Sequence, residues 1–251
     1  MTSVLVIDDN AELAENIGEI LEEIGVDVHL AENAEAALAC FDDQQWSLVV
    51  TDVRMPGIDG IELLALLKER SPGTPVLVMT GYADRDTVAR AHDSGALAVV
   101  NKPLNLDDFI ELVERLAEAE HSVLVVEDDV ALVSNLTDIL CAEHGVLPHP
   151  ATSISLARRL ANAVDFRVAL IDLRLPDGDG IALVRELIER PDGSTRPIIV
   201  MTGYPDQLGE LREIGEDVRA RDPTPDAGSK LIVMTKPFQV PRLLERLREI
   251  V

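Results

Sequence analysis

An internal repeat constrains the fold of this chain more than any other feature of its sequence. Four blocks recur in the same order, at offsets of 119, 120, 122 and 134 residues: SVLVIDD from Ser3 and SVLVVED from Ser122, DVRMPGIDGI from Asp52 and DLRLPDGDGI from Asp172, VMTGY from Val78 and from Val200, and NKPL from Asn101 and TKPF from Thr235. Solenoid repeats are much shorter than this period. The repeat therefore predicts two tandem globular domains, residues 1–119 and 120–251.

The second copy differs from the first by 12 extra residues between its Thr202 and Lys236. This stretch ends in Asp222-Pro-Thr-Pro-Asp-Ala-Gly-Ser, which has the composition of a loop. We therefore expect an insert near residues 216–229. The fourth helix of the second copy is expected to be shortened, shifted or followed by a long loop.

Each copy alternates short apolar runs with longer amphipathic ones. In the first copy the apolar runs predict buried strands at Val4–Ile7, Asp27–Leu30, Leu48–Thr51, Val76–Met79 and Ala98–Val100. Helical spacing of apolar residues predicts helices at Ala11–Ile24, Ala34–Phe41, Ile61–Arg70, Asp84–Ser94 and Leu106–Ala119. The predicted fold class is α/β, with two tandem, doubly wound, five-stranded parallel sheets.

The net charge of the chain narrows its range of partners. There are 22 Lys and Arg residues against 46 Asp and Glu, a net charge of −24. Such a surface repels phosphate backbones and anionic lipids, so we expect neither direct nucleic-acid binding nor membrane insertion. The sequence shows no secretory leader, no long apolar run and only two cysteines, which predicts a cytoplasmic protein.

Polar residues follow the predicted strands at their carboxyl ends, where ligands collect in open parallel sheets. In matching order the two sets are Asp8, Asp9, Asp52, Thr80 and Lys102, and Glu127, Asp128, Asp172, Thr202 and Lys236. Three converging carboxylates repel one another unless a cation lies between them, and their hard oxygens favour Mg²⁺. The ammonium and hydroxyl groups suit a phosphoryl group carried on one carboxylate.

A simpler interpretation is available for single residues of these sets. An aspartate at a strand end often caps the next helix, and Asp9 or Asp128 could do only that. The duplication of the whole set favours a site. Four nearby glycines are interpreted as turn formers, since no phosphate-binding glycine motif is present: Gly57, Gly60, Gly178 and Gly180.

The ordered motifs resemble the receiver domains of two-component response regulators, twice over essentially the whole chain. They are an acidic pair after the first strand, an aspartate followed by x-Arg-Met/Leu-Pro-x-x-Asp-Gly, a Thr-Gly pair and a Lys-Pro pair. The resemblance implies a flavodoxin-like, chemotaxis-regulator-like fold in each copy. It also implies phosphorylation of Asp52 and Asp172 by a histidine kinase or a histidine phosphotransfer protein.

The resemblance implies further roles. The metal ligands would be Asp8, Asp9, Asp52 and Arg54 in the first copy, and Glu127, Asp128, Asp172 and Arg174 in the second. In each set the second acid binds Mg²⁺ directly, the first acts through water, and the arginine contributes its main-chain carbonyl. Each threonine follows the phosphoryl group on activation, and each lysine pairs with it and precedes a cis proline bond, at Pro103 or Pro237.

One position departs from the pattern of the family. Receivers commonly carry an aromatic residue three positions before the lysine, where this chain has Val99 and Val233. Tyr82 and Tyr204, two positions after each threonine, are candidates to replace that residue.

We expect a phosphoryl acceptor that signals through protein contacts, and not an enzyme that turns over a separate substrate. One alternative is an Asp-nucleophile phosphatase of the haloacid dehalogenase kind, which would need an acid where this chain has Arg54 and Arg174. Another is a degenerate receiver scaffold that is never phosphorylated. The sequence leaves open the kinase, the downstream protein, a homodimer and an output domain outside this chain.

Overall fold

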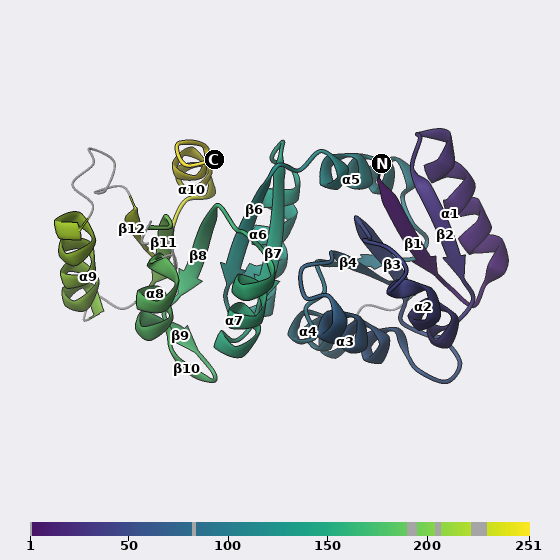
Figure 1. Cartoon of the computed structure of the whole chain (residues 1–251), viewed down its shortest axis with the longest axis horizontal. Coiled ribbons are helices and arrows are strands. Elements are labelled where there is room, and N and C mark those ends of the chain that lie inside the picture. Colours follow the sequence, from purple (N-terminus) through teal and green to yellow (C-terminus); the bar gives the residue numbers. More distant parts are fainter. Residues whose placement is uncertain (1, 82–83, 190–194, 204–206, 222–229) are drawn as a thin grey trace. The chain divides into compact units, whose positions relative to one another are not determined.

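The structure, a computed structural model of the chain, describes residues 2–81, 84–189, 195–203, 207–221 and 230–251. These residues form two five-stranded sheets with their own helices, and one two-stranded hairpin (Figure 1). They group into two compact units, Met1–Glu120 with Val130–Pro150, and His121–Asp129 with Ala151–Val251. The boundary between residues 119 and 120 stays a prediction.

The first sheet has the strand order β2-β1-β3-β4-β5, and all of its strands run parallel. Its strands are β1 (Ser3–Ile7), β2 (Asp27–Ala31), β3 (Leu48–Asp52), β4 (Val76–Thr80) and β5 (Ala98–Asn101). Its helices are α1 (Ala11–Glu23), α2 (Ala34–Phe41), α3 (Gly60–Arg70), α4 (Arg85–Asp93) and α5 (Leu106–Ala117). The chain reverses its winding direction between β1 and β3, which makes that point the expected ligand crevice.

Alternating side chains of β1 enter two separate apolar cores. Leu5 and Ile7 pack in one core with side chains of α2, α3 and α4. Val4 and Val6 pack in the other core with side chains of α1 and α5. Because both faces of the sheet are covered, its central strands are apolar without interruption until a polar residue ends each one.

The second sheet has the order β12-β11-β8-β6-β7, the same topology read from the other edge. Its strands are β6 (His121–Val126), β7 (Val146–Ala151), β8 (Val168–Asp172), β11 (Ile198–Thr202) and β12 (Leu231–Thr235). Its helices are α6 (Val130–Cys141), α7 (Ile154–Ala163), α8 (Gly180–Ile188), α9 (Leu208–Arg221) and α10 (Val240–Arg248). A core of side chains from α7, α8 and α9 covers one face of this sheet. The predicted α/β fold with two parallel sheets is confirmed.

Helix α9 corrects one expectation about the insert. It has 14 residues, whereas α4 at the corresponding place has 9, so the expected shortening is wrong. The helix continues because Leu211, Ile214 and Val218 recur at helical spacing and are buried in the core. The first residues of the insert are therefore helical, and residues 222–229 lie outside the described residues.

A short hairpin, β9 (Arg174–Leu175) with β10 (Gly178–Asp179), follows β8 and was not predicted. Its turn lies within the segment Leu-Pro-Asp-Gly-Asp, where the first copy has Met-Pro-Gly-Ile-Asp. The two copies therefore differ in the loop that directly follows the central aspartate.

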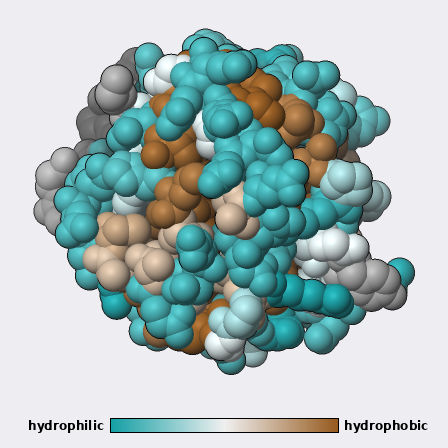
Figure 2. All heavy atoms as spheres, turned by 90° about the vertical axis from the view of Figure 1, so that its right-hand side faces the viewer, coloured by the Kyte–Doolittle hydropathy of each residue, from teal (hydrophilic) through white to brown (hydrophobic). Residues whose placement is uncertain are grey.

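The face of the molecule in Figure 2 is mainly hydrophilic, with hydrophobic side chains exposed in patches between polar ones. Four large hydrophobic residues are exposed in the part of the chain that the structure describes: Ile24, Leu30, Leu106 and Val233. Within that same part, every helix is too short or too polar to serve as a membrane span.

Candidate functional site

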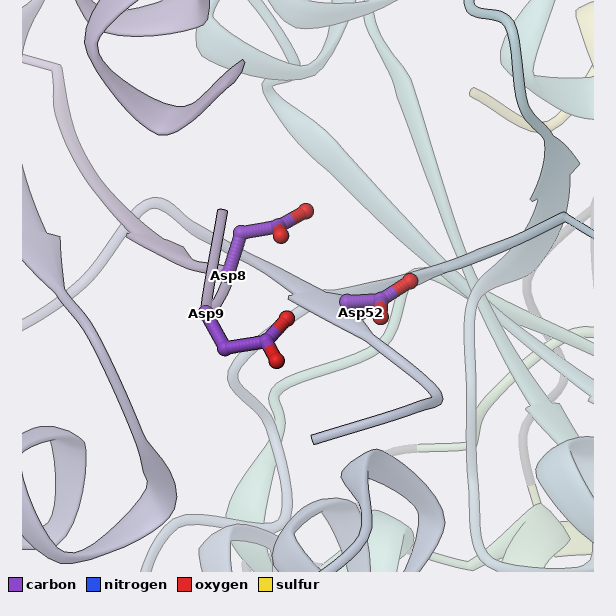
Figure 3. A group of neighbouring side chains, drawn as sticks. All are labelled: Asp8, Asp9 and Asp52. Atoms are coloured by element: carbon purple, nitrogen blue, oxygen red, sulfur yellow. The ribbon is translucent and has the colours of Figure 1, made fainter. Parts of the chain in front are cut away.

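In the first domain, three carboxylates meet at the ends of β1 and β3. One oxygen each of Asp8, Asp9 and Asp52 lies within 4.8 Å of the others. In Figure 3, Asp8 and Asp9 follow one another along the chain, and their carboxylates point toward the side on which Asp52 lies. Asp8 and Asp52 are buried, with 1% and 6% of their surface exposed, and Asp9 is exposed.

The register of the sheet brings these acids together. Ile7 lies opposite Thr51 in the parallel β1–β3 pair, so the next residues, Asp8 and Asp52, end the two strands at one level. Asn10, and not Asp9, caps α1, because its side chain accepts a hydrogen bond from Leu13 N–H. The interpretation of Asp9 as a helix cap is therefore wrong.

Lys102 is the cation of this cluster. Its Nζ lies 2.6 Å from Asp8 Oδ2 and 2.8 Å from Asp52 Oδ1. Burial alone disfavours the charged amine, but the hydrogen bonds to Asp52 and Asp8 outweigh burial and raise the pKa of Lys102. The other oxygen of Asp52, Oδ2, accepts a hydrogen bond of 3.0 Å from Arg54 N–H.

Thr80 ends β4 beside this cluster and is buried, with 2% of its surface exposed. Its carbonyl accepts a hydrogen bond of 2.8 Å from Lys102 N–H, which ties the two predicted site residues together through the backbone. The peptide bond between Lys102 and Pro103 is cis, as the resemblance implied.

The second domain repeats the cluster with Glu127, Asp128 and Asp172, again with oxygens within 4.8 Å of one another. Lys236 Nζ lies 2.5 Å from Glu127 Oε2 and 2.9 Å from Asp172 Oδ2. The cluster opens into a pocket of about 540 Å³, which Arg174 and Gly203 also line. The bond between Lys236 and Pro237 is cis as well.

The charge balance of the second cluster is similar. Burial of Glu127 is the largest effect on its carboxyl and raises its pKa, although the hydrogen bond from Lys236 acts in the opposite direction. The pKa of Lys236 is raised, because its bonds to Glu127 and Asp172 outweigh the effect of its burial. One ammonium faces three carboxylates, so each cluster keeps an excess of negative charge that a divalent cation offsets. The residues thus fit Mg²⁺.

The second cluster differs from the first in one detail that the sequence did not reveal. Asp172 Oδ1 accepts a hydrogen bond of 2.7 Å from the adjacent Leu173 N–H, whereas Asp52 accepts from the second residue after it. Thr202 is fully buried, and its hydroxyl lies 3.5 Å from the side-chain oxygen of Gln207. Its carbonyl accepts from Lys236 N–H at 2.8 Å, as in the first domain.

The remaining predicted residues have mixed outcomes. Arg54 lies in the loop after Asp52, Arg174 is the first residue of β9, and both are exposed. Tyr82 and Tyr204, the candidates for the missing aromatic residue, lie outside the described residues. Gly57 has a φ of +82°, as expected of a turn former. Gly60 and Gly180 are required for a different reason, since a Cβ atom there would meet backbone atoms beside the central aspartates.

The fold and the paired clusters define a two-domain protein of the receiver class. The model of the response regulator receiver domain family matches residues 4–114 and again residues 123–218. The chain therefore belongs to the response regulator receiver family and contains two receiver domains. Receiver domains of response regulators act in phosphorelay signalling, and histidine kinases phosphorylate them.

Known relatives are similar over different lengths. A response regulator receiver protein of Anaeromyxobacter sp. (strain Fw109-5) is 37% identical over 81% of this chain and 83% of its own length. The transcriptional regulatory protein FixJ of Bradyrhizobium diazoefficiens is 36% identical over 53% of the chain and 67% of its own length. The DNA-binding transcriptional regulator NtrC of Salmonella typhimurium is 34% identical over 45% of the chain, but only 24% of that protein is matched.

Among solved structures, a CheY-like receiver domain protein from Methanospirillum hungatei JF-1 is 30% identical to this chain. The match covers 47% of this chain and 95% of that one, with a TM-score of 0.45.

Proposed function

We propose that each receiver accepts a phosphoryl group in a Mg²⁺-dependent reaction, on Asp52 in the first domain and on Asp172 in the second. The observation that carries this proposal is the repeated arrangement of the two clusters. In each, a buried aspartate ends the central strand, and a lysine Nζ within 3 Å contacts both that aspartate and a neighbouring acid.

The reaction is a displacement at phosphorus. A carboxylate oxygen of Asp52 or Asp172 attacks the phosphorus of a phosphohistidine, and the P–N bond breaks with its electron pair moving to the imidazole nitrogen. The imidazole then takes a proton from solvent, and an acyl phosphate remains on the aspartate. When bound by the three acids of a cluster, Mg²⁺ supplies positive charge to the phosphoryl oxygens.

The residues of the chain complete this chemistry. Lys102 and Lys236 already hold their acceptor carboxylates at 2.8 and 2.9 Å, so each ammonium is placed to pair with the phosphoryl oxygens once the aspartate is modified. Thr80 and Thr202 end the neighbouring strands, and each hydroxyl can donate a hydrogen bond to the same group.

The proposed donor is a histidine kinase or a histidine phosphotransfer protein, and the proposed output is a contact with a downstream protein. Residues 1–120 hold 25 acids and 7 bases, a net charge of −18, which suits a basic docking surface on a partner. FixJ and NtrC are named as transcriptional regulators. For this chain the net charge of −24 disfavours direct contact with DNA.

We further propose that the chain is a self-modifying acceptor and not an enzyme that turns over a substrate. A phosphatase of the haloacid dehalogenase kind would need an acid two positions after the nucleophile. Here Arg54 and Arg174 occupy those positions, and an arginine side chain stays protonated at neutral pH, so it does not serve as a general acid or base.

Incubation with acetyl phosphate, a small acyl phosphate donor, tests the proposal. The intact mass is expected to increase by phosphoryl groups in Mg²⁺ but not in EDTA, and hydroxylamine should remove them, because it cleaves acyl phosphates. The matched control is the double variant Asp9→Asn with Asp128→Asn, which keeps both acceptors but loses one metal ligand in each cluster; it should stay unmodified at the same Mg²⁺ concentration. Modification that persists in EDTA, or that resists hydroxylamine, would contradict the proposed chemistry.

A further inference from the structure

Asp177 joins the acceptor loop of the second receiver, residues 173–179 directly after the proposed acceptor Asp172, to the start of helix α7. Its Oδ1 accepts a hydrogen bond of 2.8 Å from Ile154 N–H, and its Oδ2 accepts one of 2.9 Å from Ser155 N–H. The two donors are the first two residues of α7, and they lie 23 and 22 residues before Asp177 in the chain. The carboxylate therefore binds a distant helix through both of its oxygens.

The start of a helix suits such a carboxylate, because its first N–H groups have no partner within the helix and carry positive partial charge. Ser153 already caps α7 by accepting from Leu156 N–H at 3.3 Å. Asp177 accepts hydrogen bonds from the N–H groups of Ile154 and Ser155, to which the side chain of Ser153 does not bind. Burial acts to raise the pKa of Asp177. The hydrogen bonds from the N–H groups of Ser155 and Ile154 have the larger effect, so the pKa is lowered.

The acceptor loop also packs against the same helix through apolar contact. A Cβ atom placed on Gly178 would lie 3.0 Å from Ile154 Cδ1, so the end of the isoleucine side chain lies close against the backbone of the loop. Leu175 and Ile154 are buried in one core cluster. The loop is thus held to α7 by two hydrogen bonds and by packing.

Backbone hydrogen bonds order the rest of the acceptor loop, between Asp177 and the acceptor Asp172. Asp179 pairs with Arg174, and Gly178 with Leu175, in the β9–β10 hairpin. Gly180 N–H donates to Leu173 O at 3.1 Å, and Leu173 N–H donates to Asp172 Oδ1 at 2.7 Å. These hydrogen bonds therefore brace the segment of residues 172–180, in which Asp177 and the proposed phosphoryl acceptor both lie.

The first receiver has no counterpart of this side chain. The residue at the corresponding position is Gly57, which turns the loop with a φ of +82° and has no side chain to accept a hydrogen bond. The start of α2 is capped by Asn33, which accepts from Ala36 N–H at 2.9 Å. The two receivers therefore hold their acceptor loops by different means.

We propose that Asp177 is a positioning residue of the second receiver. By fixing residues 173–179 on α7, it holds the carboxylate of Asp172 and the main chain at Arg174 in the geometry that binds Mg²⁺ and accepts the phosphoryl group. This inference rests on the proposed function. It predicts that the second receiver depends on a side chain that the first receiver lacks.

The test compares Asp177→Ala with Ser153→Ala in the full chain. Both remove hydrogen bonds from the start of α7, but only the first releases the acceptor loop. With acetyl phosphate as donor and peptide mass spectrometry as readout, Asp177→Ala should raise the Mg²⁺ concentration for half-maximal modification of Asp172 by about tenfold. Asp52 in the same molecules is the internal control and should not change, and Asp177→Asn, which keeps one acceptor oxygen, should lie between.

Amide hydrogen exchange without metal gives an independent readout. Asp177→Ala should speed exchange in residues 173–180, whereas Ser153→Ala should speed it only at the start of α7. Equal effects of the two variants, or an unchanged Mg²⁺ requirement at Asp172, would overturn the inference. If neither aspartate of the native chain is modified, the proposed function fails instead, and the exchange comparison still decides whether Asp177 holds the loop.

Discussion

Replacing Gly60 by alanine is expected to destabilise the first receiver by about 3 kcal/mol and to prevent modification of Asp52. A Cβ atom on Gly60 would lie 1.9 Å from the carbonyl oxygen of Asp52, and 2.8 Å from its carbonyl carbon. Backbone atoms cannot move aside as a flexible side chain does. The start of α3 or the end of β3 must therefore shift, and the acceptor lies at that strand end.

Gly180→Ala should have the corresponding effect on the second receiver, since its Cβ would lie 2.5 to 2.8 Å from backbone atoms of Leu173 and Asp172. The control is Gly209→Ala in α9, where a Cβ meets nothing within 4 Å and where alanine favours the helix. The single tryptophan, Trp46, is buried in the first receiver, so its fluorescence during urea unfolding reports on that domain. A Gly60→Ala protein with native unfolding and normal modification of Asp52 would refute this account of the loop.

Replacing the lysine of a cluster is expected to lower the free energy of unfolding nearly as much. Lys102→Met leaves Asp8 and Asp52 buried and close together without their ammonium partner, and removal of one member of a buried ion pair is strongly destabilising. Because 21% of the lysine side chain is exposed, we discount the usual cost to about 2 kcal/mol without Mg²⁺. Lys236→Met should have the same effect in the second receiver. Neither domain that carries the substitution should accept a phosphoryl group normally.

Two comparisons test whether the destabilisation comes from the unpaired buried carboxylates and not from the loss of a lysine side chain as such. Adding Asp8→Asn to Lys102→Met should recover part of the stability, because it removes one of the two unpaired charges. Arg246→Met breaks an exposed ion pair with Glu249 and should lower the free energy of unfolding far less than Lys102→Met does. Equal unfolding free energies for the native chain and Lys102→Met in EDTA would show that the lysine does not stabilise the cluster.

The sequence predicts most of the fold because the repeat and the buried strands give mutually consistent signals. Each strand of the first sheet lies within one residue of its predicted bounds, and the apolar runs of β3 and β4 end at the polar site residues Asp52 and Thr80. The predicted burial of β2 is wrong, because Asp27, His29 and Leu30 of this edge strand are exposed. The same alignment of strand ends predicts both carboxylate clusters. The site follows from the topology, because the parallel register of β1 and β3 brings Asp8 and Asp52 to one level.

The remaining features depend on contacts that no local pattern encodes. The two bonds of Asp177 to α7 join residues more than 20 positions apart, and the motif around it gives no sign of the partner. The sequence leaves three alternatives for α9, a shortened helix, a shifted helix or a helix followed by a long loop, and the burial of Leu211, Ile214 and Val218 in the core excludes the first of them. The sequence predicts turn formers at Gly60 and Gly180, whereas the structure shows that each leaves room for the backbone beside the acceptor.

The central claim, that the chain holds two working phosphoryl acceptors, is tested most directly by intact mass after incubation with Mg²⁺ and acetyl phosphate. The native chain should gain two phosphoryl groups, while Asp52→Ala and Asp172→Ala should each gain one, on the aspartate that remains. The variant that combines Asp52→Ala with Asp172→Ala should gain none. Two additions that persist in either single variant would contradict the assignment of the acceptors. Failure of the native chain to take up phosphate or the phosphate mimic beryllofluoride would show that these domains act as an unphosphorylated scaffold.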